Sequence, residues 1–168
     1  DNDPPSIFQQ QLDFIQKSGI VTAMVGLLQA PLGTRLYERM KKENRLENVF
    51  SGDNVDGSTN IIPKMGLETL QEGYRKLLAQ IYEPQFYYER VMTFLREYQP
   101  RHRARLTLKH ALAGIRANWE LGIRQRDRTH YWKLMWWTLF RRPALLPVAM
   151  TIAVDGYHCR KMCEQQVM

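Results

Sequence analysis

One apolar run near the start of the chain constrains the fold more than any other feature. Residues Ile20–Leu28 read IVTAMVGLL, and Pro31 and Gly33 follow as turn residues. A run this short, apolar on both faces and bounded by a glycine before it and a turn after it, predicts a buried strand. Such a strand belongs in a sheet that is covered on both sides, and one strand cannot make a sheet. The partners of this strand are therefore expected to come from outside the helical remainder of the chain.

Helical patterns lie on both sides of this run. Ser6 is predicted to cap a helix that ends at Gly19, with apolar side chains at helical spacing between them. After the turn, Thr34 is predicted to cap a short helix through Lys42. Residues 1–43 thus read as helix, strand, helix, which is one step of a βα barrel. Residues 44–65 read as a polar connecting loop with a short strand at Asn60–Ile62.

The rest of the chain, residues 66–168, predicts about five helices in an antiparallel bundle or array. Pro84, Pro100 and Pro143 punctuate the pattern. The fold class is therefore mainly α, with a helix-strand-helix remnant of a barrel before the helices. The apolar stripes expected to face the core are, in order, Leu67, Leu70, Tyr74, Leu77 and Ile81; Tyr87, Val91, Phe94 and Tyr98; Leu108, Leu112, Ile115 and Trp119; and Tyr131, Leu134, Met135 and Thr138.

Length and composition narrow the class of protein. A chain of 168 residues with 44% hydrophobic content can bury one modest core. The start, DNDPP, has no signal-peptide pattern and reads as a cut made inside a longer chain or after a processing step. Two cysteines without a secretory signal favour a reducing, cytoplasmic location, and peripheral membrane contact stays open. The apolar run Pro143–Val154 is too short to cross a bilayer, which takes about 20 residues.

Positive charge is concentrated in one part of the chain. Residues 96–142 carry 12 Lys and Arg against 3 Asp and Glu, whereas residues 1–95 carry 10 against 12. The cluster at Arg101–Arg105 and the cluster at Arg124–Arg128 lie at the two ends of one predicted helix. Such a surface attracts phosphates of nucleic acid or anionic lipid. The alternative is a solvated face that meets acidic surface elsewhere, because no nucleic-acid fold signature accompanies the charge.

Three tryptophans in the same region leave two interpretations open. Trp132 and Trp136 share one helical face, and Trp137 points elsewhere. Aromatic rings beside Arg141 and Arg142 are typical of a membrane interface. The alternative is that one or two of the rings fill the helical core, since large aromatic side chains dominate burial.

Metal-binding patterns are weak. Cys159 and Cys163 lie one helical turn apart beside His158, but a third ligand is missing, so inert thiols are expected and weak metal binding is the alternative. The loop SGDNVDGSTN fails the EF-hand pattern because Gly52 and Pro63 stand where acidic residues are needed. The four histidines have no ligand spacing. We expect no metal site and no catalytic residue in this chain.

The run IVTAMVGLLQAPLGTRLYERM, with the helix before it and SGDNVDGSTNIIPKM after it, resembles cobalamin-binding radical S-adenosylmethionine (radical SAM) enzymes of the group that includes hopanoid-biosynthesis proteins. The match is to the end of the catalytic barrel plus a helical C-terminal domain of unknown function. The family's Cys-x3-Cys-x2-Cys motif, which holds the iron-sulfur cluster, is absent. The resemblance therefore implies a fragment that lacks the parent's chemistry on its own.

The resemblance also implies which residues lie near the parent's cavity. Leu28, Gln29 and Ala30, at the carboxyl end of the strand, are expected beside S-adenosylmethionine or substrate, as active sites lie at that end of barrel strands. Gly33 and Thr34 fit the family's Pro-x-Gly-Thr turn. Two roles are open for them: forming the turn and capping the helix, or contacting a ligand. Asp1 and Asp3 match an acidic segment of the family. The parent's cofactors would be a [4Fe-4S] cluster, S-adenosylmethionine and cobalamin, none of them bound by this fragment.

Two functions are predicted at this point. In the first, the chain is the C-terminal accessory portion of a radical SAM, cobalamin-dependent enzyme, with methyltransferase among the implied activities, and it closes the active site or selects substrate. Its partners are then the upstream radical SAM and cobalamin-binding domains. In the second, it is an independent helical module whose basic face binds anionic lipid or nucleic acid. In isolation, the orphan strand is expected to form a homodimer.

Overall fold

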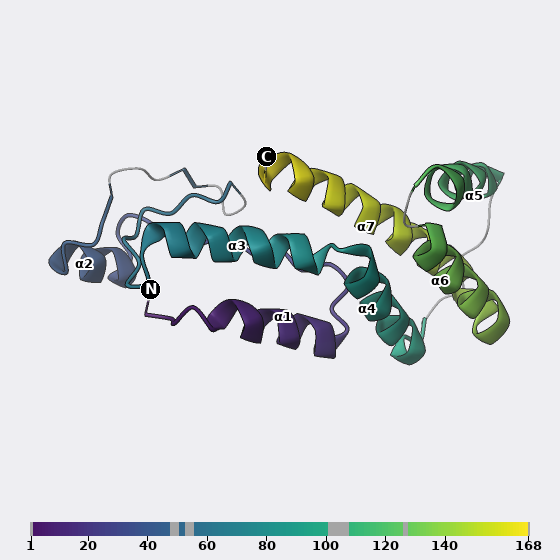
Figure 1. Ribbon diagram of the computed structural model, residues 1–168, viewed down its shortest axis with the longest axis horizontal. Helices are drawn as coiled ribbons and strands as arrows, with labels where there is room; N and C mark the ends of the chain where they lie inside the picture. Colours follow the sequence, from purple (N-terminus) through teal and green to yellow (C-terminus); the bar gives the residue numbers. More distant parts are fainter. Residues whose placement is uncertain (1, 48–50, 53–55, 101–107, 126–127, 168) are drawn as a thin grey trace.

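The chain is mainly helical, as expected. The computed structural model describes residues 2–47, 51–52, 56–100, 108–125 and 128–167. Within these ranges it holds seven α-helices and no strand (Figure 1). The helices are α1 (Ile7–Ser18), α2 (Arg35–Lys42), α3 (Leu67–Ile81), α4 (Pro84–Glu97), α5 (Leu108–Trp119), α6 (Arg128–Arg141) and α7 (Leu146–Val167), with a π-helix η1 (Glu120–Arg124) and a 3-10 turn η2 (Pro143–Leu145).

The predicted strand at Ile20–Leu28 is wrong as secondary structure. No ladder forms there, because the described residues contain no second strand that could pair with it. The predicted strand at Asn60–Ile62 is reduced to one antiparallel bridge between Leu46 and Ile61. The described residues therefore do not confirm a barrel remnant, and the apolar run forms a single unpaired segment.

Capping residues behave as local chemistry predicts at two of three positions. Gly19 ends α1 with φ 68°, in the left-handed region that glycine adopts without strain. Thr34 caps α2, since its Oγ1 accepts a hydrogen bond from the backbone N–H of Tyr37 at 3.2 Å. Ser6 does not cap α1. Its backbone is already helical, and its hydroxyl oxygen accepts instead from Nε2 of Gln10.

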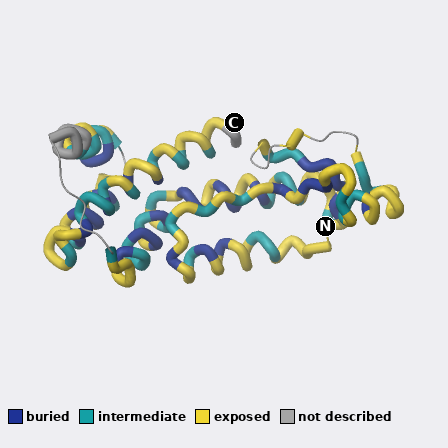
Figure 2. The backbone as a smooth tube through the Cα atoms, turned by 180° about the vertical axis from the view of Figure 1, so that it is seen from behind, coloured by how far each residue is buried: buried dark blue, intermediate teal, exposed yellow. Residues whose placement is uncertain are grey.

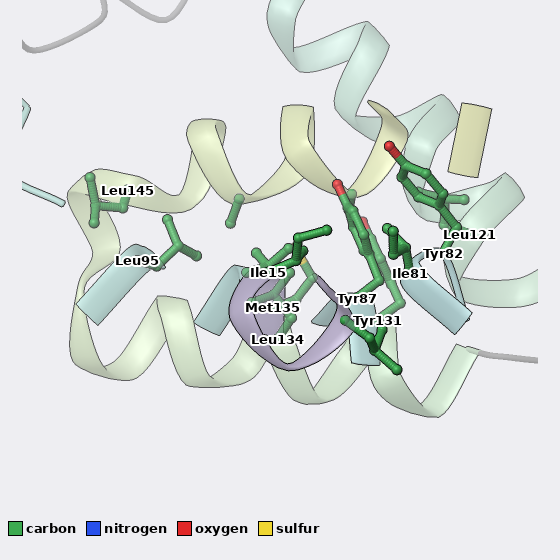
Figure 3. Packing of buried hydrophobic residues seen from close by; sticks show 14 of the residues in the cluster. Ile15, Ile81, Tyr82, Tyr87, Leu95, Leu121, Tyr131, Leu134, Met135 and Leu145 are labelled. Carbon is green, nitrogen blue, oxygen red and sulfur yellow. The ribbon is translucent and has the colours of Figure 1, made fainter. Parts of the chain in front are cut away.

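A single core joins the N-terminal helix to the later helices. Helix α1 packs on α3 and α4, while α7 packs on α3, α4 and α6. Figure 2 shows the helices buried where they meet and exposed on their outer sides. The side chains that meet in this core include Ile15 from α1, Ile81 from α3, Tyr87 and Leu95 from α4, Tyr131, Leu134 and Met135 from α6, and Leu145 from η2 (Figure 3).

The apolar stripes predicted for the helices hold for α6 and fail for α5. All four predicted positions of α6 are buried. In α5, by contrast, Ile115 and Trp119 are 66% and 65% exposed, and the side chains of Leu108 and Leu112 lie outside the described residues. The reason is that α5 meets α7 through another side, where Gly114 faces Met150.

Close packing of α7 on α4 depends on a missing side chain. A Cβ at Gly156 would lie well inside contact distance of the Tyr87 ring, which is buried and whose hydroxyl donates to the carbonyl oxygen of Ile152 at 2.7 Å. We expect Gly156→Ala to lower the free energy of unfolding by about 1–3 kcal/mol, because overpacking outweighs the better helix propensity of alanine. Urea denaturation measures the change.

Gly114→Ala is the matched control, because it is also a helical glycine. Its Cβ would meet only the flexible end of Met150. This variant should be neutral or slightly stabilising, and equal effects of the two substitutions would contradict the packing argument.

Candidate functional site

Exposure alternates along Val21–Leu28 as it does in a strand, although the segment is not paired as one and begins with a bend at Val21 and Thr22. Val21, Ala23, Val25 and Leu27 are buried or half-buried, and the residues between them are exposed. Leu27 is 6% exposed, whereas Met24 is 85% and Leu28 is 53% exposed. Alternation with a period of two is the mark of an extended backbone. One side of the segment therefore faces the helices, and the other faces outward.

Two tyrosine hydroxyls take the place of a neighbouring strand along one edge. Tyr82 donates to the carbonyl oxygen of Ala23, and Tyr74 donates to that of Val25, each at 3.0 Å. Carbonyls two residues apart point to the same edge of an extended segment. Burial raises the pKa of Tyr82, so its hydroxyl stays protonated and keeps donating. Side chains of α3 and the residue after it thus pair two carbonyl oxygens of this edge.

A buried arginine fixes the start of the segment. Arg90, on α4, is fully buried, and its guanidinium donates to the carbonyl oxygens of Ile20 at 3.1 Å and Ile81 at 2.6 Å and to Oε1 of Gln16 at 3.0 Å. Burial lowers the pKa of Arg90. One guanidinium therefore ties α1, α3 and the extended segment together.

The opposite edge of the segment is open. Among the described residues, the backbone N–H groups of Thr22, Met24 and Gly26 donate to no acceptor, and the carbonyl oxygens of these three residues accept no hydrogen bond. In an extended backbone these groups point away from the edge that Ala23 and Val25 offer to the helices. We call the backbone groups of Thr22, Met24 and Gly26 the open edge. An edge of this kind is a template for strand addition.

The three residues predicted to lie beside a ligand are divided by the structure. Leu28 is exposed, and its carbonyl oxygen accepts from Oγ1 of Thr59 at 2.7 Å. Ala30 is fully buried, and the side-chain amide of Asn60 both accepts from its N–H, at 2.7 Å, and donates to its carbonyl, at 2.9 Å. Gln29 is buried too, and its amide binds the connecting loop at Ser58. Gln29 and Ala30 hold the loop in place, and Leu28 faces outward.

A small cavity lies beside Leu28. Its volume is about 140 Å³, and its walls come from α1, the extended segment, the loop around Thr59 to Met65 and the first half of α3. Asp3 also lines it, while Asp1 lies outside the described residues. Pockets for cofactor-sized ligands usually measure about 300–1,000 Å³. This chain alone therefore does not enclose such a ligand here.

The turn after the segment shows a structural role. The Thr34 hydroxyl donates to the carbonyl oxygen of Pro31 at 2.7 Å in addition to capping α2, and Gly33 has φ 80°. Both residues serve the turn and cap that were one of their two predicted roles. The residues NIIPKM form the bridge to Leu46 and one wall of the cavity, through Ile61 and Pro63.

Part of the predicted basic surface can be placed. The cluster Arg101–Arg105 lies outside the described residues, as do Arg126 and Asp127. Arg128 and Lys133 are exposed on α6. Arg142 is turned inward, where its Nη1 donates to the carbonyl oxygens of Leu95, Arg96 and Tyr98 at 2.7–3.1 Å.

The three tryptophans differ in exposure, as core packing for some rings and an interfacial position for others would allow. Trp137 is half-buried against the core, with the Arg96 guanidinium 5.9 Å from its ring centroid. Trp132 and Trp136 are 36% and 53% exposed. Core packing therefore accounts for Trp137, while the outer pair stays partly exposed, with Trp132 hydrogen-bonded to the carbonyl oxygen of Gly122.

The thiols show no sign of a reactive or metal-binding site. Cys159 and Cys163 are free and half-buried, and burial raises the pKa of Cys163, which lowers its thiolate fraction. Over the described ranges, no three His, Cys, Asp or Glu side chains converge on a point where they could hold a metal ion. No helix within those ranges is both long and apolar enough to span a membrane.

Sequence reasoning missed the residues that hold the segment. Tyr74 was assigned to the core, Tyr82 was not singled out, and Arg90 was passed over, although it lies three residues after Tyr87 on the apolar side of α4. The sequence signal for Arg90 is a charged residue on the core face of a helix. Such a residue is expected to have specific hydrogen-bond partners, because a buried charge needs them.

Comparison with known proteins identifies the family. Residues 34–168 match the model of a domain of unknown function, DUF4070, and the chain belongs to this family. The chain is also similar to the uncharacterized methyltransferase sll1242 of Synechocystis sp., with 28% identity over 152 residues. That match covers 86% of the chain and 28% of the relative, so the chain spans about a quarter of the relative's length. No solved structure matches.

The arginine bridge gives a direct test of how the segment is held. Arg90→Met removes the donors for two backbone carbonyls that the protein buries, so we expect the free energy of unfolding to fall by about 2–4 kcal/mol. Tyr82→Phe removes a single neutral hydrogen bond and should cost about 1 kcal/mol. Urea denaturation of both variants makes the comparison, and an Arg90→Met variant as stable as the parent would show that the bridge is dispensable.

Proposed function

We propose that this chain is the C-terminal accessory portion of a radical SAM, cobalamin-dependent enzyme of the hopanoid-biosynthesis-like group, and that it joins the rest of the enzyme through the open edge. In this position it closes or shields the active site from the carboxyl end of the segment, where Leu28 is exposed. Methyl transfer is the activity we propose for the whole enzyme, in line with the printed name of the similar Synechocystis protein.

The open edge is the observation that carries the proposal. Three consecutive outward positions, Thr22, Met24 and Gly26, leave their backbone groups unpaired within the described residues. Unpaired backbone groups in an extended segment are stabilised by pairing with another strand. A barrel that ends at this segment would supply that strand, and family membership together with the partial coverage of a longer relative supports this source.

Chemistry in such an enzyme would reside outside this chain. We place this chemistry in the upstream domains because the chain has two cysteines, whereas an iron-sulfur cluster is held by three or four thiolates. This chain would then contribute one side of the active-site cavity. Leu28 faces outward, while Ser58 holds Gln29 and Asn60 holds Ala30.

The test uses the full-length gene product. We expect a Cys-x3-Cys-x2-Cys motif upstream of this chain and formation of 5′-deoxyadenosine from S-adenosylmethionine by the reconstituted protein. Met24→Pro should lower this activity at least tenfold, because proline removes one N–H of the open edge while tolerating an extended backbone.

Met24→Ala is the matched control for that experiment. It removes the same side chain, keeps the N–H and should retain most of the activity. A gene product without the three-cysteine motif, or full activity in Met24→Pro, would refute the proposal.

Self-association of the separate 168-residue chain is a second consequence of the open edge. Without its partner strand, the edge should pair with a second copy, so light scattering should report dimers or larger species at high concentration. Met24→Pro should shift the population towards monomer, while Met24→Ala should not. A monodisperse wild-type monomer at high concentration would be evidence against an edge that needs pairing.

A further inference from the structure

Helix α6 has two apolar faces, and the fold uses one of them. Its inner face is buried in the core. The outer face carries a second row that is exposed: Trp132, Trp136, Leu139 and Phe140 are 36%, 53%, 41% and 77% exposed. A helix that is apolar all round is normally buried on every side. We define these four residues as the outer row of α6, and packing among the described residues leaves all four of them exposed.

The aromatic members of the outer row form an ordered ridge. The ring centroids of Trp132 and Trp136 lie 6.3 Å apart, and those of Trp136 and Phe140 lie 5.8 Å apart with nearly parallel planes. Trp132 is fixed at one end, because its Nε1 donates to the carbonyl oxygen of Gly122 in η1 at 2.9 Å. The ridge is preorganised, so binding through it costs little side-chain entropy.

Positive charges border the ridge on both sides. With 3.6 residues per turn, Arg128 and Lys133 lie about 20° beyond the two angular limits of the outer row, and both are exposed. In the sequence, the stretch 96–142 that includes α6 carries 12 Lys and Arg against 3 Asp and Glu, and several of these residues lie outside the described ranges. An apolar aromatic strip flanked by cations is the arrangement by which helices lie in the plane of an anionic lipid interface.

A second exposed apolar row lies on the element next to α6. Ile115, Trp119 and Ile123 recur every four residues along α5 and η1 and are 66%, 65% and 53% exposed. Gly122, which holds the Trp132 ring, is the residue before Ile123. Exposed apolar side chains on two adjoining elements give a larger area than one helix row would.

We propose that the outer row of α6, with Arg128 and Lys133 beside it, docks this protein on an anionic lipid bilayer, lying at headgroup depth without crossing the membrane. The charge favours anionic lipid over an uncharged apolar partner. The ring stacking favours lipid over nucleic acid, because bases need open ring faces, whereas Trp136 and Phe140 cover part of each other. The inference is independent of the function proposed above.

The experiment is sedimentation of the full-length gene product with vesicles. Binding should be strong on vesicles of phosphatidylcholine and phosphatidylglycerol, weak on phosphatidylcholine alone, and reduced by salt. Trp136→Ser/Phe140→Ser should weaken binding to the anionic vesicles about tenfold or more, because both side chains lose apolar burial in the interface. Brominated lipid should quench the tryptophan fluorescence of the wild type.

Charge is tested separately. Arg128→Glu/Lys133→Glu should reduce binding at low salt about tenfold or more.

Two matched controls locate the effect. Phe14→Ser changes another exposed phenylalanine, 65% exposed on α1 against 77% for Phe140, and should bind like the wild type. Lys41→Glu/Lys42→Glu makes the same charge reversal on exposed residues of α2 and should also retain binding. Circular dichroism verifies that every variant is folded.

Three results would overturn the proposal. One is failure of the wild type to bind anionic vesicles at low salt. Another is an unchanged affinity in Trp136→Ser/Phe140→Ser. The third is tight binding of single-stranded RNA that depends on the same row and is not displaced by anionic vesicles, which would assign the ridge to nucleic acid.

Discussion

The structure depends on side chains of helices that satisfy the backbone of one extended segment. A strand without neighbours has peptide groups that cannot pair with each other, and burying them unpaired is costly. Here Tyr74, Tyr82 and Arg90 supply donors to its carbonyls along one edge. The segment can therefore lie against the helices with Leu27 inside, and α1 is held to α3 and α4 across it. On the other edge, the backbone groups of Thr22, Met24 and Gly26 have no partner among the described residues.

Sequence patterns predicted the helices well, because helix formation is decided by signals close together in the chain. Thr34 and Gly19 were readable as cap and stop, and the buried face of α6 followed from its spacing. The strand predicted at Ile20–Leu28 does not form, although exposure there alternates with a period of two. The hydrogen-bond partners of this segment were not predictable in the same way, since they lie far away in sequence. Periodicity does not say whether another strand or side-chain hydroxyls will pair with the backbone.

The prediction that Leu28, Gln29 and Ala30 lie beside a ligand stays a prediction, and the structure shows only what these residues contact within the chain. These three residues lie where the extended segment meets the connecting loop, and they bond to Thr59, Ser58 and Asn60. The sequence could not tell that Asn60 would hold both backbone groups of Ala30, because such a contact spans 30 residues and involves a common polar side chain. The exposure of Ile115 and Trp119 was likewise hidden, since spacing identifies an apolar face and does not say what covers it.

Two surfaces remain that internal packing does not explain, and their chemistry separates their partners. The open edge presents peptide N–H and C=O groups in register, which only another extended backbone can match repeatedly. The outer row of α6 presents stacked rings between cations and no series of backbone groups, because its peptides are already bonded within the helix. A strand has nothing to pair with there, whereas a lipid interface accepts both the rings and the charges. One chain can therefore join a neighbouring domain and touch a membrane without the two contacts competing for the same residues.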